Sequence, residues 1–505
     1  MQKIIFDDEI TIWWQEKGND TATRLTKLYL DGEYHGETKK THYTFSGLSP
    51  QRTYQVCIEK YDGEKLKTKQ SYIFRTAKAK NRLDITQAPY FAIGDGKTDN
   101  TNAIQRALDD CTKKDCVYVP SGKFLSGALN IGSNTELYLA DGATLKGIET
   151  FEGYLPKIKD RFEGITLQCY RSLINVGEMD EEKDCVFENV VIRGKGTIFG
   201  GGLPLSNSIL QTERVLLKEY MENNVAHVQA CESKDTLPGR ARGRLIRVCN
   251  TKNVIISGLT LGYGASWNLH FIYSKDVTTY NCKILSDTLY NADGTVEMEH
   301  VWNGDGLDPD SSENCVVFNT FFSTFDNAIA IKSGKNPEGN KINRPTKNVY
   351  IFDCGGGKDL AIGSEISGGV EGVYVWDCTF NESWGINLKT TPDRGGYIKN
   401  VNVKDCNVAS ITVRTHLCFN NDGETAGTLT KIADLHFENL YVNGVFQVKD
   451  APPKEIPPVF IHGFDENVIQ NVLLRNIHIA DREGDVKPNI VAKNVKNLSL
   501  ENIFV

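Results

Sequence analysis

The chain has 505 residues, of which 40% are hydrophobic and 24% charged, so it can form two or more domains around a sizeable buried core. Its net charge of −8 argues against nucleic acid or an anionic membrane surface as the main partner. With 45 glycines and only four methionines, the composition is typical of many short strands joined by tight turns.

The first residues and the cysteines indicate a compartment. Residues 1–8 (MQKIIFDD) are acidic where a signal peptide has its apolar core, and no run approaches the about 18 apolar residues of a membrane span. The thirteen cysteines contain no C-x-x-C pair, which argues against a zinc ribbon. We therefore expect free thiols in a cytoplasmic protein, or secretion if a leader has been removed.

Residues 1–76 are predicted to form a small β-sandwich. Residues 10–14 and 24–30 alternate as strands, and residues 48–58 (LSPQRTYQVCI) follow a loop. This last segment resembles the leucine, proline and corner tyrosine of fibronectin type III domains, with Tyr54 as the tyrosine. No polar cluster occurs in this region, so we expect a spacer or adaptor without catalytic residues.

Residues 77–82 are predicted to be a basic linker to a second domain over residues 83–505. A glycine-aspartate-glycine turn at 94–96 is followed by a helical pattern with Ile104, Leu108 and Cys111 on one face. Short strands are expected at 117–122 and 135–139. A phosphate-binding loop is the rival interpretation of the glycine-rich turn, but no G-x-x-x-x-G-K-[ST] motif follows it.

From about residue 189 a short sequence motif recurs. It consists of a turn residue, alternating apolar positions and then Asn, Asp or Gly. Clear copies stand at 253–259, 276–282, 348–354, 372–378, 400–406, 471–477 and 497–503. Spacings of roughly 23 to 28 residues between consecutive copies indicate a solenoid, and the period-2 alternation indicates coils of strands. Each coil cannot bury its own apolar face, so stacking of neighbours creates the core.

Four cysteines occupy the same place in their copies of the repeat, namely Cys282, Cys354, Cys378 and Cys406. Stacked small hydrophobic side chains inside the coils are the expected interpretation, and a ladder of metal ligands is the alternative.

Two acidic clusters lie about one coil apart. Residues 303–312 (NGDGLDPDSS) contain Asp305 and Asp308, and residues 323–334 (STFDNAIAIKSG) contain Asp326. Carboxylates at the same phase of neighbouring coils lie on one surface, and glycosidic cleavage needs one carboxylic acid and one carboxylate. Mutual repulsion raises the pKa of one member and so holds a proton for the acid role. The alternative is that these residues only end strands in turns.

These segments resemble glycoside hydrolase family 28, the polygalacturonase family, and most closely its bacterial exo-acting members. The resemblance covers about residues 83–505, and further matching segments are 267–270 (WNLH), 362–369 (IGSEISGG), 389–391 (KTT) and 394–397 (RGGY). It implies an all-β fold, a right-handed parallel β-helix (a pectin-lyase-like solenoid) after the small β-sandwich. It also implies inverting hydrolysis of α-linked galacturonate or rhamnogalacturonan chains without a cofactor or metal.

The four signature sites of that family are all altered in this chain. The family's Asn-Thr-Asp is NGD at 303–305, and its Gly-Asp-Asp is FDN at 325–327, which keeps the usual proton donor as Asp326 and replaces the next Asp by Asn327. Its Gly-His-Gly is GGK at 356–358, with Gly357 in place of the histidine. Its Arg-Ile-Lys is NLK at 387–389, which loses the arginine at Asn387 and keeps Lys389. Loss of a guanidinium removes a bidentate partner for a sugar carboxylate.

The resemblance assigns catalysis to Asp305 and Asp326 with Asn327 beside them. Substrate binding is assigned to Asp308, Lys389, Asn387, Gly357 and His270, to Arg161 and Glu163 in the loop at 161–164 (RFEG), and to Arg242 and Arg244. His270 is either a groove residue or a core histidine, and Trp267 and Trp384 are either sugar platforms or buried wedges. The two arginines end an insertion at 199–244, which closes one end of the groove and imposes exo action, or is only a surface excursion.

The sequence thus predicts an exo-acting glycoside hydrolase for pectin-derived, galacturonate-containing oligosaccharides. Three alternatives stay open: a hydrolase of rhamnogalacturonan or another unusual glycan, a Ca²⁺-dependent lyase or an epimerase on the same scaffold, and a carbohydrate-binding protein with impaired catalysis. Apart from the oligosaccharide no partner is predicted, and the sequence leaves the oligomeric state open.

Overall fold

The computed structural model describes residues 1–15, 24–180, 182, 184–356, 358–417, 420, 422–444, 457–480 and 489–505. The chain divides into two compact units, Met1–Asn81 and Arg82–Val505. No helix in the described ranges is both long and apolar enough to cross a membrane.

The first unit consists of two antiparallel sheets. One has the order β1 (Gln2–Ile5), β2 (Glu9–Trp13), β5 (His42–Ser46), and the other β4 (Glu33–Thr38), β3 (Arg24–Leu30), β6 (Thr53–Asp62), β7 (Lys65–Arg75). The hydroxyl of Tyr54 accepts a hydrogen bond from the backbone N–H of Ser49 at 2.8 Å, as in a tyrosine corner. Assignment to the fibronectin type III fold stays a prediction.

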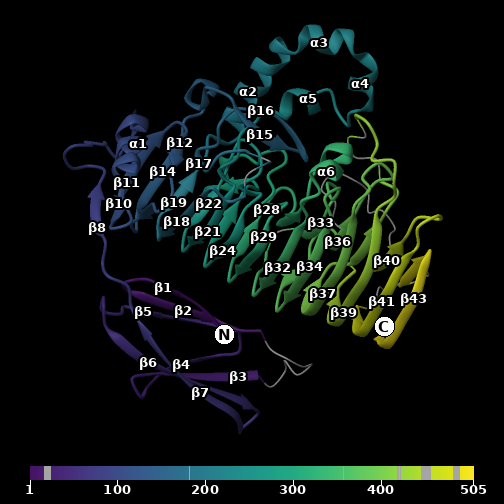
Figure 1. Cartoon of the computed structure of the whole chain (residues 1–505), viewed down its shortest axis with the longest axis horizontal. Helices are drawn as coiled ribbons and strands as arrows, with labels where there is room; N and C mark the ends of the chain where they lie inside the picture. Colours follow the sequence, from purple (N-terminus) through teal and green to yellow (C-terminus); the bar gives the residue numbers. More distant parts are fainter. Residues whose placement is uncertain are drawn as a thin grey trace. The chain divides into compact units, whose positions relative to one another are not determined.

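The second unit is a right-handed parallel β-helix, in which the strands of successive coils stack into three long sheets, one of which ends at Phe321–Ser323 (Figure 1). The first sheet has the order β8 (Asn81–Asp84), β10 (Asp115–Val119), β13 (Glu136–Leu139), β18 (Phe187–Gly194), β21 (Thr251–Ser257), β24 (Lys275–Tyr280), β29 (Glu313–Phe318), β32 (Thr346–Phe352), β34 (Val370–Trp376), β37 (Tyr397–Val408), β39 (Lys431–Val442), β41 (Ile469–Ile479), β43 (Val495–Phe504), and β35 (Thr379–Phe380) also pairs with β37.

The other two long sheets run beside it. The second has the order β9 (Asp95–Asp99), β11 (Gly122–Ser126), β14 (Ala143–Gly147), β19 (Thr197–Phe199), β22 (Thr260–Gly262), β25 (Lys283–Leu285), β30 (Phe321–Ser323). The third has the order β12 (Leu129–Ile131), β17 (Ile174–Val176), β20 (Ile246–Cys249), β23 (Leu269–Ile272), β28 (Leu307–Asp310), β31 (Ile329–Ile331), β33 (Asp359–Ile362), β36 (Gly385–Lys389), β38 (Ile411–Arg414), β40 (Val459–His462), β42 (Ile490–Lys493).

Helices and hairpins decorate this solenoid. They are α1 (Thr101–Asp110), the 3-10 turn η1 (Phe151–Tyr154), the hairpin β15 (Ile158–Phe162) with β16 (Ile165–Cys169), α2 (Gly202–Leu216), α3 (Lys218–Asn223), α4 (Val225–Ala230), α5 (Thr236–Gly239), the hairpin β26 (Leu289–Tyr290) with β27 (Val296–Met298), and α6 (Asn336–Ile342). In Figure 1, α2–α5, β15, β16 and α6 lie on the same side of the coils.

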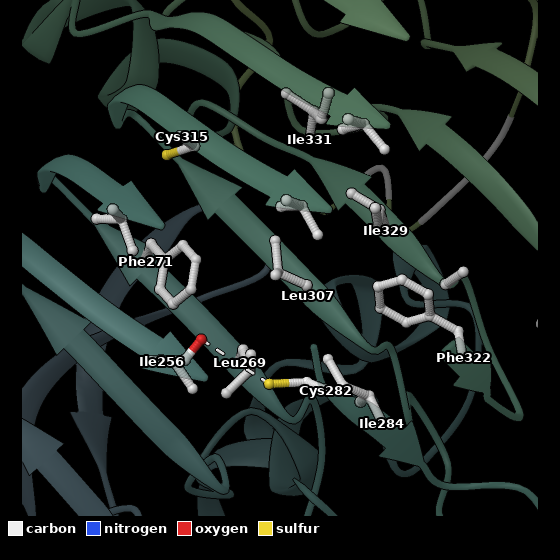
Figure 2. Packing of buried hydrophobic residues seen from close by; sticks show 14 of the residues in the cluster. Ile256, Leu269, Phe271, Cys282, Ile284, Leu307, Cys315, Phe322, Ile329 and Ile331 are labelled. Atoms are coloured by element: carbon white, nitrogen blue, oxygen red, sulfur yellow. Dashed lines mark hydrogen bonds between the residues drawn. The ribbon is translucent and has the colours of Figure 1, made fainter. Parts of the chain in front are cut away.

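The apolar positions of the repeat fill the interior of the coils. Leu269 pairs with Leu307, and Leu307 with Ile329, in three successive strands, and all three are fully buried (Figure 2). Burying one such side chain contributes about 1.5–3 kcal/mol. The predicted column of cysteines is buried as well, and the cysteines in the described residues are all free thiols.

The recurring asparagines bend the chain near the start of the strands of the first sheet. Asn314 and Asn348 have φ of 55°, a left-handed conformation that Asn tolerates better than most residues. Their side chains form a ladder, in which Asn348 Nδ2 donates to Asn314 Oδ1 at 3.1 Å and Asn314 Nδ2 to Asp276 Oδ1 at 2.9 Å. The turn residue of the repeat therefore fixes both the bend of each coil and its contact with the next.

Candidate active site

The predicted catalytic residues lie on consecutive rungs of the third sheet. Asp305 stands two residues before β28, and Asn327 two residues before the neighbouring β31. The N–H of Gly306 donates to the carbonyl of Asn327 at 2.9 Å, so the two turns are in register. Parallel pairing thereby brings Asp305, Asp326 and Asn327 together, although the first and last are 22 positions apart.

Asp305 is the buried member of the carboxylate pair. It is 3% exposed, while Asp326 is half-buried. Burial, and after it the negative charge of Asp326, raises the pKa of Asp305 to about 7. The free protein therefore carries a proton on Asp305 at pH values below about 7.

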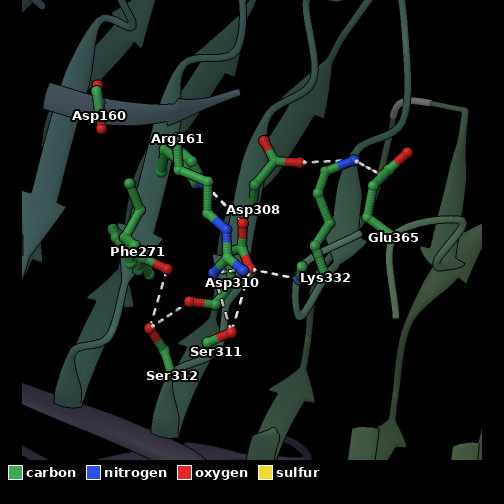
Figure 3. A network of polar contacts seen from close by, with 12 residues as sticks. Asp160, Arg161, Phe271, Asp308, Asp310, Ser311, Ser312, Lys332 and Glu365 are labelled. Carbon is green, nitrogen blue, oxygen red and sulfur yellow. Dashed lines mark hydrogen bonds and ion pairs between the residues drawn. The ribbon is translucent and has the colours of Figure 1, made fainter. Parts of the chain in front are cut away.

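One buried ammonium group serves three carboxylates. Lys332 Nζ lies 3.4 Å from Glu365 Oε2 and 3.5 Å from Asp308 Oδ1 (Figure 3). It also lies 3.8 Å from Asp305 Oδ2. Burial opposes the ionisation of Glu365, but the charges of Lys332 and Arg394 and a hydrogen bond from Ser364 together outweigh it and hold the pKa of Glu365 below its usual range. Burial and the charge of Asp305 raise the pKa of Asp308 well above its usual range. Lys332 thus favours the ionised form of all three carboxylates, but at the two aspartates burial and the neighbouring negative charges outweigh it and favour protons.

A chain of hydrogen bonds runs from the pair along the sheet. Asn327 Nδ2 donates to Asp359 Oδ1 at 2.7 Å, and Asn387 Nδ2 donates to Asp359 Oδ2 at 3.1 Å. Asp359 begins β33, is 1% exposed, and has its pKa raised by burial. It is a further carboxylate of the centre, in addition to Asp305, Asp326, Asp308 and Glu365.

Two cations end this chain. Lys389 Nζ donates to Asn327 Oδ1 at 3.1 Å, and Arg414 Nη2 donates to Asn387 Oδ1 at 3.0 Å. The guanidinium of Arg414 also lies 3.7 Å from the ring centroid of Trp384. At position 387 this chain has an amide where the family pattern has an arginine. The guanidinium of Arg414, on the next rung, is hydrogen-bonded to that amide.

The predicted residues at 161 and 270 lie in a buried layer of the site. Arg161 Nη1 contacts Asp310 Oδ1 at 3.1 Å and Ser311 Oγ at 3.1 Å, with both ends of the ion pair fully buried (Figure 3). His270 Nε2 is 3.4 Å from Asp310 Oδ2, and burial lowers the pKa of His270 to about 4. His270 is fully buried, which favours the core histidine of the two interpretations.

The two arginines that end the insertion are also buried among protein groups. Arg242 donates to the backbone oxygens of Gly239, Ala265 and Trp302 and to Asn303 Oδ1. Arg244 lies over the rings of Phe162 and Trp267, at 4.4 and 4.7 Å from their centroids. In this structure both side chains fix the loops around the centre, and Trp267, 3% exposed, is a buried wedge.

An aromatic group lies beside the aspartates. His300 stacks on Phe325 with ring centroids 3.9 Å apart, and Trp302 meets Phe325 edge-on at 5.2 Å. Trp302 is 61% exposed, and Lys358 Nζ lies 4.4 Å from the Phe325 ring. Phe325 directly precedes Asp326, so an exposed indole stands close to the predicted acid–base pair. The predicted Gly357 lies outside the described residues.

The insertion at 199–244 forms a wall that is tied to distant parts of the chain. Arg240 contacts Asp422 through Nη1 at 2.6 Å and Nη2 at 2.8 Å, and Lys335 Nζ contacts the same carboxylate at 2.8 Å. Arg240 Nε also donates to Glu163 at 2.8 Å. Four separate segments therefore meet at these ion pairs, which places the predicted Glu163 in the wall.

The wall extends toward the predicted catalytic pair. The pKa of Glu232, at the end of the insertion, is raised by burial and by the charges of Glu163 and Asp326. His227, Cys231 and Asp422 cluster within 4.8 Å, the spacing of possible metal ligands. Because Arg240 and Lys335 already neutralise Asp422, the cluster suits an ion-pair junction better than a divalent cation.

Sequence reasoning missed Asp359, Arg414, Lys332, Glu365 and Asp422. Asp359 could have been found from the repeat, because Ala328 and Asp359 occupy matching positions of neighbouring rungs and the N–H of Ala328 donates to the carbonyl of Asp359. Asp422 had no such signal, since it lies 182 positions from Arg240 in a loop outside the repeat.

The comparisons with known proteins agree with this architecture. The family model of glycosyl hydrolases family 28 matches residues 111–451. An exo-poly-alpha-D-galacturonosidase from Dickeya chrysanthemi is 26% identical over 409 residues, 75% of this chain and 65% of that protein. A probable polygalacturonase from Vitis vinifera is 29% identical over 329 residues, 62% of this chain and 58% of that protein. The chain thus spans less than two thirds of either relative.

Two solved structures share the fold. A family 28 exopolygalacturonase from Yersinia enterocolitica superposes with a TM-score of 0.78 at 19% identity, covering 99% of this chain and 98% of that one. A hyperthermoactive exopolygalacturonase from Thermotoga maritima gives a TM-score of 0.63 at 25% identity, covering 84% of this chain and 91% of that one. The family model spans more than half of the sequence, and the β-helix matches as well. The chain therefore belongs to glycosyl hydrolases family 28.

Proposed function

We propose that this chain is an exo-acting glycoside hydrolase that releases a terminal sugar from galacturonate-containing oligosaccharides derived from pectin. The observation that carries the proposal is the pairing of the buried Asp305, whose pKa is raised to about 7, with the half-buried Asp326 on adjacent rungs. Hydrolysis of a glycosidic bond needs one carboxylic acid and one carboxylate flanking the bond.

In the proposed mechanism the pair carries one proton. One carboxyl group protonates the leaving oxygen, and the other takes a proton from the attacking water, so the anomeric configuration inverts. The family resemblance gives the donor role to Asp326, whereas the proton of the free protein lies on Asp305. Asn327 has its amide engaged by Asp359 and Lys389, so it can shape the water site but cannot take a proton.

Cations and the wall support the choice of substrate and the exo mode. Lys389 and Arg414 lie along the same hydrogen-bonded chain as the pair and suit the carboxylate of a uronic acid. The names of the relatives given above describe enzymes that act on galacturonan, a polymer of a uronic acid. A negatively charged substrate of this kind agrees with the positive charges of Lys389 and Arg414. The wall is held against the site by the ion pairs of Arg240 with Glu163 and Asp422, and in this proposal it limits how much of a sugar chain can pass the centre.

The test is product analysis on a panel of galacturonate, rhamnogalacturonan and side-chain oligosaccharides. We expect a single sugar to be released from galacturonate oligosaccharides, and NMR to show inversion at the new anomeric centre. An unsaturated product that requires Ca²⁺ would identify a lyase, and tight binding without turnover would identify a binding protein. Release from rhamnogalacturonan alone would reassign the substrate.

Variants of the pair test the site itself. Asp305→Asn and Asp326→Asn should each lower kcat by about 10²–10⁴-fold with little change in affinity. An aryl galacturonide, in which the aryl group itself leaves without needing a proton, identifies the donor, because the variant that lacks the donor regains turnover on this substrate. Asp276→Asn, in the exposed ladder, is the matched control and should keep its activity. Wild-type turnover in both pair variants would refute the assignment.

A further inference from the structure

Asp359 is a buried carboxylate with an unusual pair of partners. It is 1% exposed, and its two oxygens each accept a hydrogen bond from a side-chain amide, Asn327 at 2.7 Å and Asn387 at 3.1 Å. A buried carboxylate is costly unless its lone pairs are satisfied. Here the two amides on neighbouring rungs provide that satisfaction.

The carboxylate also determines which way each amide points. An amide has a donor end and an acceptor end, so an amide that donates to Asp359 must turn its oxygen away from it. The oxygen of Asn327 then meets Lys389 Nζ at 3.1 Å, and the oxygen of Asn387 meets Arg414 Nη2 at 3.0 Å. Without an acceptor at 359, either amide could turn its NH₂ group toward a cation, which is repulsive.

The charge balance gives the second reason. The chain of hydrogen bonds from Lys389 to Arg414 contains two cations, two neutral amides and the single carboxylate Asp359. In the family pattern a carboxylate stands at position 327, next to the proton donor. In this chain position 327 is an amide, and the carboxylate lies one rung further along the same sheet.

We propose that Asp359 is the positioning carboxylate of this active site, which orients Asn327 and through it holds Lys389 for the uronic acid group of the substrate. This rests on the proposed function. Asp359 does not contact the substrate in this role; it replaces, from the next rung, the negative charge that position 327 lacks.

The test exchanges the two side chains. In the double variant Asn327→Asp/Asp359→Asn, the new amide at position 359 can donate to the new carboxylate at position 327 and accept from Asn387, so every hydrogen bond and the net charge are kept. Asp359→Asn alone sets amide against amide and removes the charge, and should lower kcat/KM by roughly 10²-fold. Asn327→Asp alone sets two carboxylates 2.7 Å apart, so they share a proton and activity should return only at acid pH.

We expect the exchanged double variant to recover most of the kcat/KM lost in Asp359→Asn. The pH profile is the second readout, because a merely structural role would lower the folded fraction without moving the profile. Asp434→Asn is the control, since Asp434 also accepts an amide from the next coil, Asn471 at 2.8 Å, but lies outside the site. Wild-type kcat/KM and pH profile in Asp359→Asn would overturn the proposal, as would an exchanged variant no better than that single variant.

Failure of the proposed function gives a different result. If the wild-type protein hydrolyses no oligosaccharide, the coupling between positions 327 and 359 is measured in another way. Unfolding temperatures and the calorimetric affinity for trigalacturonate are compared for the wild type, the two single variants and the double variant. Positive coupling between positions 327 and 359, with weaker binding in Asp359→Asn, then keeps the positioning role. No coupling, or unchanged binding, overturns it.

Discussion

The ammonium group of Lys332 lies 3.8 Å from the carboxylate of Asp305, and both side chains are buried. The same cation contacts Glu365 and Asp308, so it cannot fully compensate three carboxylates. Burial opposes the ionisation of the two aspartates and Lys332 favours it, and this balance determines how the site responds to pH and to loss of the cation.

The first prediction concerns pH. Because the pKa of Asp305 is raised to about 7, the pair holds its proton below that pH and loses it above. The value of kcat/KM should therefore fall as pH rises through about 7, since that parameter reports ionisations of the free enzyme. Measurement of kcat/KM from about pH 5 to about pH 9 checks this, and a rise over the same range would contradict it.

The second prediction concerns Lys332→Met. Removing one partner of a buried charge cluster leaves uncompensated carboxylates, so the free energy of unfolding should fall by about 3–5 kcal/mol. The substitution should also move the alkaline limb of the activity profile to higher pH, because the charge of Lys332 lowers the pKa of Asp305 and is lost in the variant. The control is Lys252→Met, which breaks only an exposed pair with Glu188 at 3.2 Å and should cost about 0–1 kcal/mol. Urea unfolding monitored by circular dichroism compares the two variants, and equal losses would argue against the cluster.

The third prediction concerns the wall. Asp422→Asn removes the charge that holds Arg240 and Lys335 together, so the insertion should loosen around the centre. Early products from a long oligogalacturonate should then include fragments longer than one sugar, as seen by mass spectrometry. Asp235→Asn breaks only the exposed pair with Arg214 inside the insertion and should keep the wild-type product pattern. Unchanged single-sugar release by Asp422→Asn would mean that the wall does not impose exo action.

The fourth prediction concerns Trp302. An exposed indole beside the pair offers a flat face to a sugar ring, so Trp302→Ala should raise KM about five- to tenfold, a loss of ~1 kcal/mol, with kcat little changed. Trp302→Phe should keep most of the affinity. The control, Tyr441→Ala, removes a ring that is 50% exposed on β39 of another sheet and should leave KM unchanged. An equal effect of both alanine variants would remove Trp302 from the binding surface.

The sequence alone was enough to predict the solenoid and the neighbourhood of Asp305 and Asp326. Both follow from local signals, because alternating apolar positions define the strands and asparagines in the left-handed region define the turns. A fixed repeat then places equivalent residues on adjacent rungs, so the proximity of the two acidic clusters follows from spacing alone.

Only the tertiary structure placed the remaining groups. Arg161 and His270 are buried because the β15–β16 hairpin folds over the third sheet, and that packing depends on contacts such as Arg161 with Asp310, 149 positions away. Asp359 and Arg414 belong to the site because their side chains turn toward Asn387 on the neighbouring rung. Asp422 belongs to it because a loop outside the repeat brings it against Arg240. The protonation states in this site depend on burial and on hydrogen bonds between segments that are distant in the sequence. The period-two pattern of the strands carries no information about either.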